Sequence, residues 1–141
     1  MRTLFTVLLL GFVLTACSGV NSLSGNEPLT ERYWRVLEID AQPVNVGNNK
    51  AEPHIVLTAE RKAHGSDGCN RFTGAYDNTA GLRFGRLAST MMACPQPVME
   101  QARKFMQAAE ATVDFRIQGK TLELLDSGGR VRMRLEAVAL K

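Results

Sequence analysis

One segment of the chain repeats its apolar residues at helical spacing, whereas the segments around it repeat them at every second position. Apolar residues recur three or four positions apart at Val98, Ala102, Phe105, Ala109 and Val113. This spacing predicts a single amphipathic helix. Pro97 suits the first turn of that helix, and Glu100 stands where a negative charge favours the positive end of the helix dipole. One helix among many short strands restricts the chain to few folds.

After the helix, apolar and polar residues alternate over residues 113–117, 121–125 and 131–135. The turn sequences 118-QGK-120 and 126-DSGGR-130 join these runs, so we expect a β-meander. Before the helix, further tracts rich in aromatic and β-branched residues or bounded by turn residues suit strands, namely 33–39, 54–59, 62–66, 72–77 and 82–84. The segment 40–53 is rich in Pro, Gly and Asn and is expected to be a loop.

About seven short strands of this kind cannot all leave wide edges exposed to other chains. We therefore expect an α+β fold, in which an antiparallel, strongly curved or barrel-like β-sheet is closed on one side by the one main α-helix.

The N-terminus has the order of a bacterial export signal. Arg2 precedes an apolar run at residues 4–14, and small residues follow up to Cys17. The sequence 14-LTAC-17 resembles the lipobox, which predicts that residues 1–16 are a lipoprotein signal peptide and that Cys17 becomes the acylated first residue of the mature protein, carrying chains such as palmitate. The alternative is ordinary cleavage after residue 16, which leaves Cys17 free. Ser18 resembles the sorting residue of outer-membrane lipoproteins.

The mature chain is expected to have one domain. Residues 17–30 are rich in Ser, Gly and Asn and are predicted to form a lipid-anchored flexible tether, and residues 31–141 form the domain. The full sequence has 17 Lys and Arg against 14 Asp and Glu, and loss of Arg2 with the signal leaves it only mildly basic. Dedicated nucleic-acid binding is therefore not expected.

Two motifs, 68-GCNRFTGAY-76 and 87-LASTMMACPQP-97, are followed by an acidic residue, a helix and a C-terminal meander. This arrangement resembles the META (HslJ-like) domain family over about residues 31–137. The resemblance implies an antiparallel, barrel-like domain linked to envelope stress and drug resistance, with no established reaction or cofactor. The matching positions are Gly68, Cys69, Asn70, Arg71, Phe72, Gly74, Tyr76, Thr90, Met92, Ala93 and Cys94.

Physical roles can be expected for several of these residues. Gly68 and Gly74 permit turns or close approach of the backbone, and Asn70 can bond backbone groups nearby in the sequence. Phe72 and Tyr76 would share one face of a strand.

The cysteines allow three interpretations. Once Cys17 is acylated, Cys69 and Cys94 remain in an oxidising compartment, which favours a disulfide between them. A Cys₂His₂ metal site with His54 and His64 is an alternative, but the close ligand spacing typical of zinc sites is missing. A nucleophilic Cys69 with His64 as its base is the other. We expect no metal, no cofactor and no catalytic residue.

Two further groups of side chains have simple interpretations. Arg130, Arg132 and Arg134 are expected to form the solvated face of the last strand, with lipid phosphate binding as the alternative. The methionines near the helix start are expected to fill the core, with a groove for apolar ligands as the alternative. These are Met91, Met92, Met99 and Met106.

The sequence thus predicts a non-enzymatic, outer-membrane-anchored periplasmic lipoprotein that supports envelope stress tolerance or drug resistance through binding or assembly. Its expected partners are the membrane, through the acyl chains, and an unknown envelope protein or small hydrophobic ligand. A carrier or sensor of hydrophobic small molecules that uses the barrel interior is the alternative function. A thiol-dependent enzyme centred on Cys69 is the third.

Overall fold

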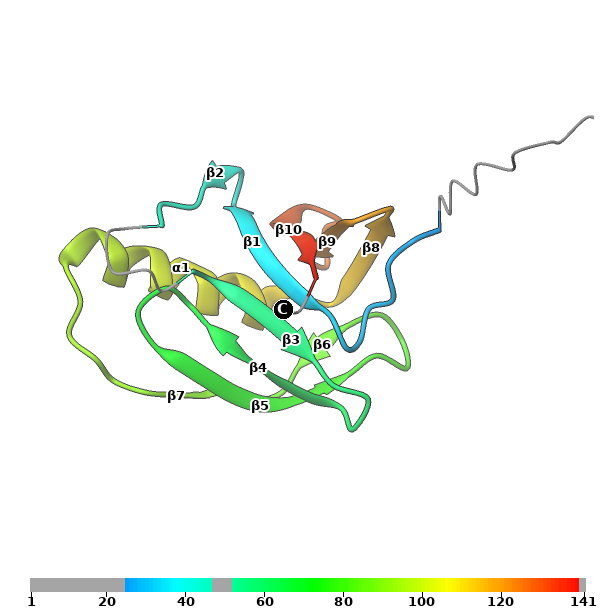
Figure 1. Cartoon of the computed structure of the whole chain (residues 1–141), viewed down its shortest axis with the longest axis horizontal. Helices are drawn as coiled ribbons and strands as arrows, with labels where there is room; N and C mark the ends of the chain where they lie inside the picture. The colour runs from blue at the N-terminus through cyan, green and yellow to red at the C-terminus, as the bar shows by residue number, and fades with distance from the viewer. Residues whose placement is uncertain (1–24, 47–51, 140–141) are drawn as a thin grey trace, which may run out of the picture.

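The computed structural model describes residues 25–46 and 52–139, so the predicted signal peptide and the acylation of Cys17 lie outside the described residues. A ten-stranded antiparallel sheet curves around one helix, and its main path runs β6-β5-β4-β3-β1-β10-β9-β8 (Figure 1). The elements are β1 (Tyr33–Ile39), β2 (Gln42–Pro43), β3 (His54–Leu57), β4 (Lys62–Ser66), β5 (Arg71–Asp77), β6 (Arg83–Phe84), β7 (Ala88–Ser89), α1 (Gln96–Ala111), β8 (Asp114–Gln118), β9 (Thr121–Leu125) and β10 (Val131–Val138). The predicted α+β fold is confirmed, with a sheet that is curved but not closed.

Most differences from the predicted elements are small. The strands β2 and β7 were not predicted, because two residues are too few to show a period. β2 falls within the segment expected to be a loop, where it forms a tight hairpin with the end of β1. The proposed dipole role of Glu100 is wrong. This residue lies beyond the first turn of α1, and its carboxylate is 3.7 Å from the Lys104 ammonium.

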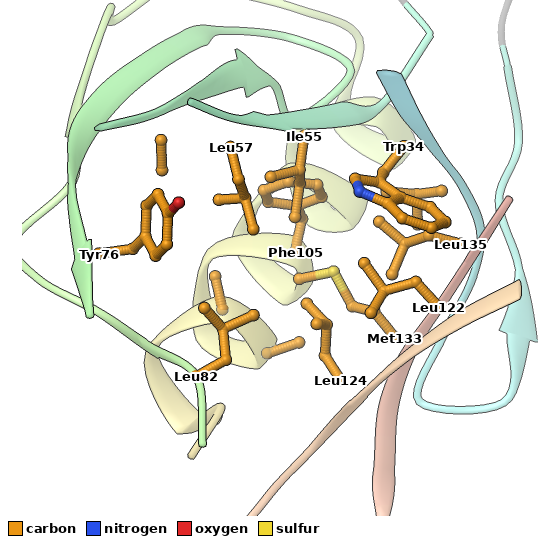
Figure 2. Close-up of a cluster of buried hydrophobic side chains, with 14 of the residues drawn as sticks. Trp34, Ile55, Leu57, Tyr76, Leu82, Phe105, Leu122, Leu124, Met133 and Leu135 are labelled. Carbon is orange, nitrogen blue, oxygen red and sulfur yellow. The ribbon is translucent and has the colours of Figure 1, made fainter. Parts of the chain in front are cut away.

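The core lies between α1 and the concave face of the sheet (Figure 2). Trp34, Leu57 and Phe105 are at most 1% exposed, and side chains from β9 and β10 complete the cluster. Phe105 of α1 packs against Phe72 of β5, with ring centroids 5.4 Å apart. The inside of the sheet is therefore filled by the side chains of the protein itself.

The N-terminal segment 25–30 corrects the predicted domain boundary. The Asn26 side chain accepts a hydrogen bond from the Gly119 N–H at 2.8 Å, and the Glu27 N–H donates to the Gly119 carbonyl at 2.8 Å. Leu29 packs against the core, and its carbonyl accepts the Trp34 indole N–H at 2.8 Å. These bonds join the segment to the β8–β9 turn and to β1. The predicted tether, residues 17–30, therefore extends too far along the chain, because the domain already includes Asn26.

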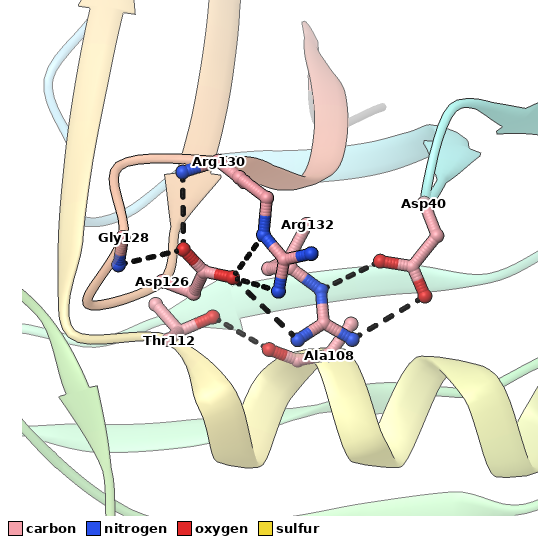
Figure 3. Close-up of polar contacts among 7 residues, drawn as sticks. All are labelled: Asp40, Ala108, Thr112, Asp126, Gly128, Arg130 and Arg132. Atoms are coloured by element: carbon pink, nitrogen blue, oxygen red, sulfur yellow. Dashed lines mark hydrogen bonds and ion pairs between the residues drawn. The ribbon is translucent and has the colours of Figure 1, made fainter.

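The three arginines of the last strand and its preceding turn are bound to carboxylates, and Figure 3 shows two of them, Arg130 and Arg132. Arg130 Nε donates to Asp126 at 3.0 Å, and Arg132 Nε donates to Asp40 at 2.6 Å. Arg134 bonds to Glu38 at 2.8 Å and to Glu123 at 3.1 Å. The side chain of Arg132 is only 18% exposed. The expected solvated face is therefore present at Arg130 and Arg134, whose side chains are 78% and 40% exposed, and is wrong for Arg132. The ion pairs tie the β9–β10 turn to β1 and engage the groups that would bind lipid phosphate.

This network makes the stability of the fold sensitive to acid. The Arg130 N–H and guanidinium, together with the Gly128 N–H, lower the pKa of Asp126. Hydrogen bonds from Arg116 and Arg134 lower the pKa of Glu123. A carboxylate with a lower pKa in the folded state stabilises the fold above its unfolded pKa of about 4. This stabilisation is lost as the pH falls through the lower pKa that the carboxylate has in the folded state.

We therefore expect thermal unfolding followed by circular dichroism to show a steep loss of stability from about pH 5 downward. Asp126→Asn should lower the stability at neutral pH and flatten this dependence, because its side chain no longer titrates. Glu110→Gln, on the exposed side of α1, is the matched control and should keep the wild-type profile. If the stability of the wild type and of Asp126→Asn falls in parallel as the pH is lowered, Asp126 does not contribute to the acid sensitivity.

Candidate functional site

A hollow of about 730 Å³ lies beside β3, β4 and β5, and residues of both sequence motifs line it. The first motif contributes Cys69, Arg71 and Phe72, and the second contributes Thr90 and Met92. Its polar wall also includes His54, His64, Glu52, Tyr33 and Ser66. The hollow is thus built where two segments that are distant in the sequence meet.

The loop between β4 and β5 is organised by Asp67, which is 2% exposed. Its Oδ1 accepts the backbone N–H groups of Cys69 at 2.8 Å and of Asn70 at 2.6 Å. Gly68 has a φ of 98°, which favours glycine and gives this residue its expected turn role. Asp67 is not among the site residues predicted from the sequence. Its signal is the turn chemistry of 66-SDG-68, in which an Asp side chain bonds to the backbone two residues ahead.

Asn70 and Thr90 join the two motifs. The Asn70 Oδ1 accepts the Thr90 hydroxyl at 3.1 Å and the Met92 N–H at 2.7 Å. The Thr90 hydroxyl also accepts the Arg71 N–H at 3.1 Å. Asn70 was expected to bond backbone groups close by in the sequence, and this expectation is wrong, because Met92 is 22 positions away. The amide side chain holds the second motif against the first.

The two cysteines lie at disulfide distance beneath these hydrogen bonds. Their Cα atoms are 6.0 Å apart, within the range that a disulfide can bridge, and their sulfur atoms are 2.06 Å apart. Cys69 is 5% exposed, while Cys94 is partly exposed directly before α1. The pair therefore links the β4–β5 loop to the start of the helix.

The remaining residues of the first motif pack the sheet. Phe72 and Tyr76 are 3% and 4% exposed and share the inner face of β5, as expected. The Tyr76 hydroxyl donates to the Thr58 carbonyl at 2.7 Å. A Cβ at Gly74 would lie 2.8 Å from the Arg86 carbonyl oxygen, so the close approach expected at this glycine is present. These residues determine the shape of the domain.

Tyr33 and His54 form one side of the hollow. Their rings stack with centroids 4.4 Å apart, and the Tyr33 hydroxyl donates to Glu52 at 3.1 Å. Burial and the Glu52 carboxylate raise the pKa of Tyr33 to about 12, so the phenol keeps its proton. His54 Nδ1 lies 2.8 Å from the Glu52 carbonyl, which can only accept, so Nδ1 carries a proton and Nε2 remains available.

Arg71 is the strongest cationic group of the hollow. Within residues 25–46 and 52–139, Arg71 forms no ion pair with a carboxylate, whereas Arg35 nearby contacts Glu52 at 3.6 Å and Glu136 at 3.7 Å. An unpaired guanidinium is a planar, permanently charged donor that suits carboxylate or phosphate groups. The hollow therefore presents Arg71, two imidazoles and the Glu52 carboxylate beside the apolar side chain of Met92.

The profile of the META domain family matches residues 27–139, which is most of the chain. The chain belongs to the META domain family. The match begins beside Asn26, where the N-terminal segment joins the fold. The HslJ resemblance is consistent with this membership.

Two solved structures share the fold of this META domain. One is an NMR structure of a protein from Burkholderia xenovorans, with 22% identity, a TM-score of 0.63, and coverage of 79% of this chain and 85% of that chain. The second NMR structure has 21% identity, a TM-score of 0.57, and coverage of 75% and 86%. No curated protein matches the chain. The comparisons therefore establish the family and the fold.

The geometry of this META domain bears on the metal site and on the nucleophilic cysteine, the two alternatives to a disulfide. Among the described residues, no group of three or more His, Cys, Asp or Glu side chains is arranged to hold a metal ion. At a sulfur separation of 2.06 Å, Cys69 and Cys94 do not offer free thiols. In the same part of the chain, no helix is long and apolar enough to cross a membrane.

The expectation that the methionines fill the core is largely wrong. Met91, Met92 and Met99 are 98%, 58% and 46% exposed, and Met106 alone of the four packs partly against the core. Leu87, at the start of the second motif, packs against the core, whereas Met91 and Met92 lie farther along the motif and remain exposed. The exposed Met92 thus leaves an apolar side chain beside the hollow.

Proposed function

We propose that this META domain protein is a non-enzymatic lipoprotein that binds an anionic partner group in the periplasm and thereby supports envelope stress tolerance or drug resistance. The observation that carries the proposal is the hollow itself, where both family motifs meet and where Arg71 forms no ion pair within the described residues. The Glu52 carboxylate also lines the hollow, and it is bound by the Tyr33 hydroxyl and lies 3.6 Å from the Arg35 guanidinium. Exposed Met92 at the rim can add contact with an apolar part of the same partner.

The arrangement of the motif residues favours binding over catalysis. Asp67, Asn70 and Thr90 direct their side-chain oxygens to groups of the protein itself, and Cys69 and Cys94 lie at bonding distance from each other. These residues hold the wall of the hollow in one shape. A preformed wall reduces the conformational entropy that this protein loses when a partner binds.

The alternative function, a carrier of hydrophobic small molecules, requires a different location from the one expected. The interior of the sheet is occupied by Trp34, Phe105 and their neighbours, so it offers no barrel pocket (Figure 2). An apolar ligand would have to bind on the outside of the domain, for example beside Met92. The surface hollow is common to both functions.

The proposed anchor keeps the domain near the membrane. If Cys17 carries acyl chains, residues 18–25 separate it from Asn26, which is fixed to the fold, and a fully extended segment of this length spans at most about 30 Å. The start of α1 lies at the opposite end of the molecule from the N-terminal segment (Figure 1). The second motif leads into α1, so it would be turned toward the periplasm.

We expect Cys17→Ala to prevent acylation and to leave unprocessed precursor or protein released from membranes. Fractionation of cells and mass spectrometry of the N-terminal peptide test this. Ser18→Ala is the matched control, since it leaves the acylated residue in place. Normal maturation and outer-membrane partition of the Cys17→Ala protein would contradict the anchor.

The binding proposal is tested with the full lipidated protein in cells that lack the chromosomal copy. Arg71→Ala should reduce survival of heat and of envelope-active drugs, at an unchanged protein level and melting temperature. Arg83→Ala, an exposed arginine on β6 away from the hollow, is the matched control. Equal survival with Arg71→Ala and wild type would contradict binding through this hollow.

A further inference from the structure

A row of cross-strand partners crosses the sheet where β3, β4 and β5 lie side by side (Figure 1). His54 of β3 is paired with Ser66 of β4, and Ser66 is paired with Arg71 of β5. Such partners share one face of a sheet at strand spacings of about 4.8 Å. The row faces outward, because Ile55 and Phe72, the next residues of β3 and β5, are buried in the core. His54 and Arg71 therefore flank Ser66, and all three line the hollow.

Ser66 supplies an unused hydrogen-bond donor between these two side chains. The residue is 8% exposed, and its hydroxyl oxygen accepts the Gly68 N–H at 3.1 Å. Among the described residues, no group accepts the proton of this hydroxyl. A buried donor without an acceptor costs free energy, so an acceptor atom of a ligand placed over Ser66 would be stabilised.

The two neighbours of Ser66 have opposite hydrogen-bonding roles. The Arg71 guanidinium can only donate, and it forms no ion pair within the described residues. His54 Nδ1 donates to the Glu52 carbonyl at 2.8 Å, so the neutral imidazole presents Nε2 as an acceptor. The row thus offers an acceptor at His54 and donors at Ser66 and Arg71.

This order of donors and acceptors distinguishes between classes of anion. An ionised carboxylate and a phosphate diester only accept hydrogen bonds, so an oxygen of either group would face the lone pair of His54 Nε2. A phosphate monoester has a second pKa of about 6 and can share one proton with Nε2 near neutral pH. Its other oxygens remain free to accept from Ser66 and Arg71.

The two carboxylates nearest to the row are already bound. The Glu52 carboxylate accepts the Tyr33 hydroxyl at 3.1 Å and lies 3.6 Å from the Arg35 guanidinium. The Asp67 carboxylate is buried, where it accepts the backbone N–H groups of Cys69 and Asn70. Arg71 therefore keeps its charge available for a ligand.

We propose that the hollow binds a phosphate monoester, whose phosphoryl group sits on the Ser66 hydroxyl between His54 Nε2 and the Arg71 guanidinium. The organic part of the ester extends along the side chain of Met92, which is 58% exposed at the rim. This inference rests on the proposed anion-binding function and names the class of anion. A soluble ester and a lipid headgroup with a terminal phosphate share this chemistry.

The test uses the full lipidated protein in a maltoside detergent, with binding measured by titration calorimetry at neutral pH. Three probes share a phenyl ring and differ in the anion: phenyl phosphate is the monoester, methyl phenyl phosphate is the diester, and benzoate is the carboxylate. The wild type should bind the monoester at least about tenfold more tightly than the other two, because only the monoester satisfies every group of the row. Short-chain phosphatidic acid separates the two sources. Binding tighter than that of phenyl phosphate indicates a lipid headgroup, and weaker binding indicates a soluble ester.

Variants assign the preference to individual side chains. His54→Phe keeps an aromatic ring beside Tyr33 but removes the Nε2 acceptor, so it should weaken phenyl phosphate at least about tenfold and benzoate much less. Arg71→Ala should abolish binding of all three probes, and Arg71→Lys should restore part of it, because lysine keeps the charge without the planar fork. Arg83→Ala is the control and should bind like the wild type. Circular dichroism checks that each variant is folded.

The outcomes separate the ligand class from the proposed function. Benzoate or the diester binding as tightly as phenyl phosphate, with loss in Arg71→Ala, would overturn the monoester and leave anion binding in place. Wild-type affinity for phenyl phosphate in the His54→Phe variant would overturn it too. If no phosphate probe binds the wild type, the inference fails, and the survival of cells with Arg71→Ala decides the proposed function independently.

Discussion

Replacement of both Cys69 and Cys94 by serine is expected to lower the melting temperature of the domain by about 15–20 °C. The two cysteines are separated by 25 positions, and closure of a loop of that length stabilises a fold by about 3.5 kcal/mol on the chain-entropy model. A domain of this size is stable by only about 5–15 kcal/mol. The loss should loosen the β4–β5 loop and the start of α1 together, because the pair joins these two segments.

Thermal unfolding followed by circular dichroism, with and without a reductant, measures this effect. The wild type treated with reductant should melt like the double serine variant, whereas the variant should not respond to reductant. Ser89→Ala on β7, an exposed position of the second motif, is the matched control and should melt like the wild type. Equal melting of the wild type and the double variant under oxidising conditions would show that the cysteines are not paired in solution.

Hydrogen exchange gives a second measurement of the same pair. Asn70 and Thr90 also hold the two motifs together, so the hollow should remain partly formed without the disulfide. Amides near the start of α1 should exchange faster in the serine variant, while those of β9 and β10 should keep their protection. Uniform acceleration across the sheet would mean that the pair stabilises the whole fold rather than this end of it.

The sequence predicts the long elements of this fold well, because each carries a repeating pattern. The spacing of Ala102, Phe105 and Ala109 identifies the buried face of α1, and the predicted range 33–39 coincides with β1. The patterns fail at β2 and β7, whose two residues show no period. The N-terminal segment has no apolar repeat either, so its attachment through Asn26 and Leu29 was missed.

The candidate site was predicted in part. The motifs contain Arg71, Thr90 and Met92, but no local pattern indicates that these residues line one hollow. The partner of Asn70 lies 22 positions away, and contacts at that separation depend on how the strands pair. The exposure of Met91 was also missed, since composition alone cannot separate an apolar residue on an outer loop from one in the core.

Phe105→Ala is expected to cost about 3–5 kcal/mol, enough to unfold much of the protein at physiological temperature. Phe105 is fully buried and contacts the ring of Phe72, so truncation leaves a cavity between α1 and the sheet. Urea unfolding followed by circular dichroism gives the loss, and Phe105→Leu gives a smaller loss that can be measured if the alanine variant does not fold. Met106→Ala, the next helix residue and only partly buried, is the control and should lose about 1 kcal/mol.

The Phe105→Leu variant also tests whether the core and the disulfide act jointly in holding α1 against the sheet. Phe72 lies three residues after Cys69 and touches Phe105, so both changes act on the contact between β5 and the helix. Phe105→Leu combined with the double serine variant should therefore differ from the sum of the separate losses by about 0.5 kcal/mol or more. The Met106→Ala change, away from Phe72, should add to the serine variant without such a difference. Strict additivity for Phe105→Leu would show that the helix is held at two independent places.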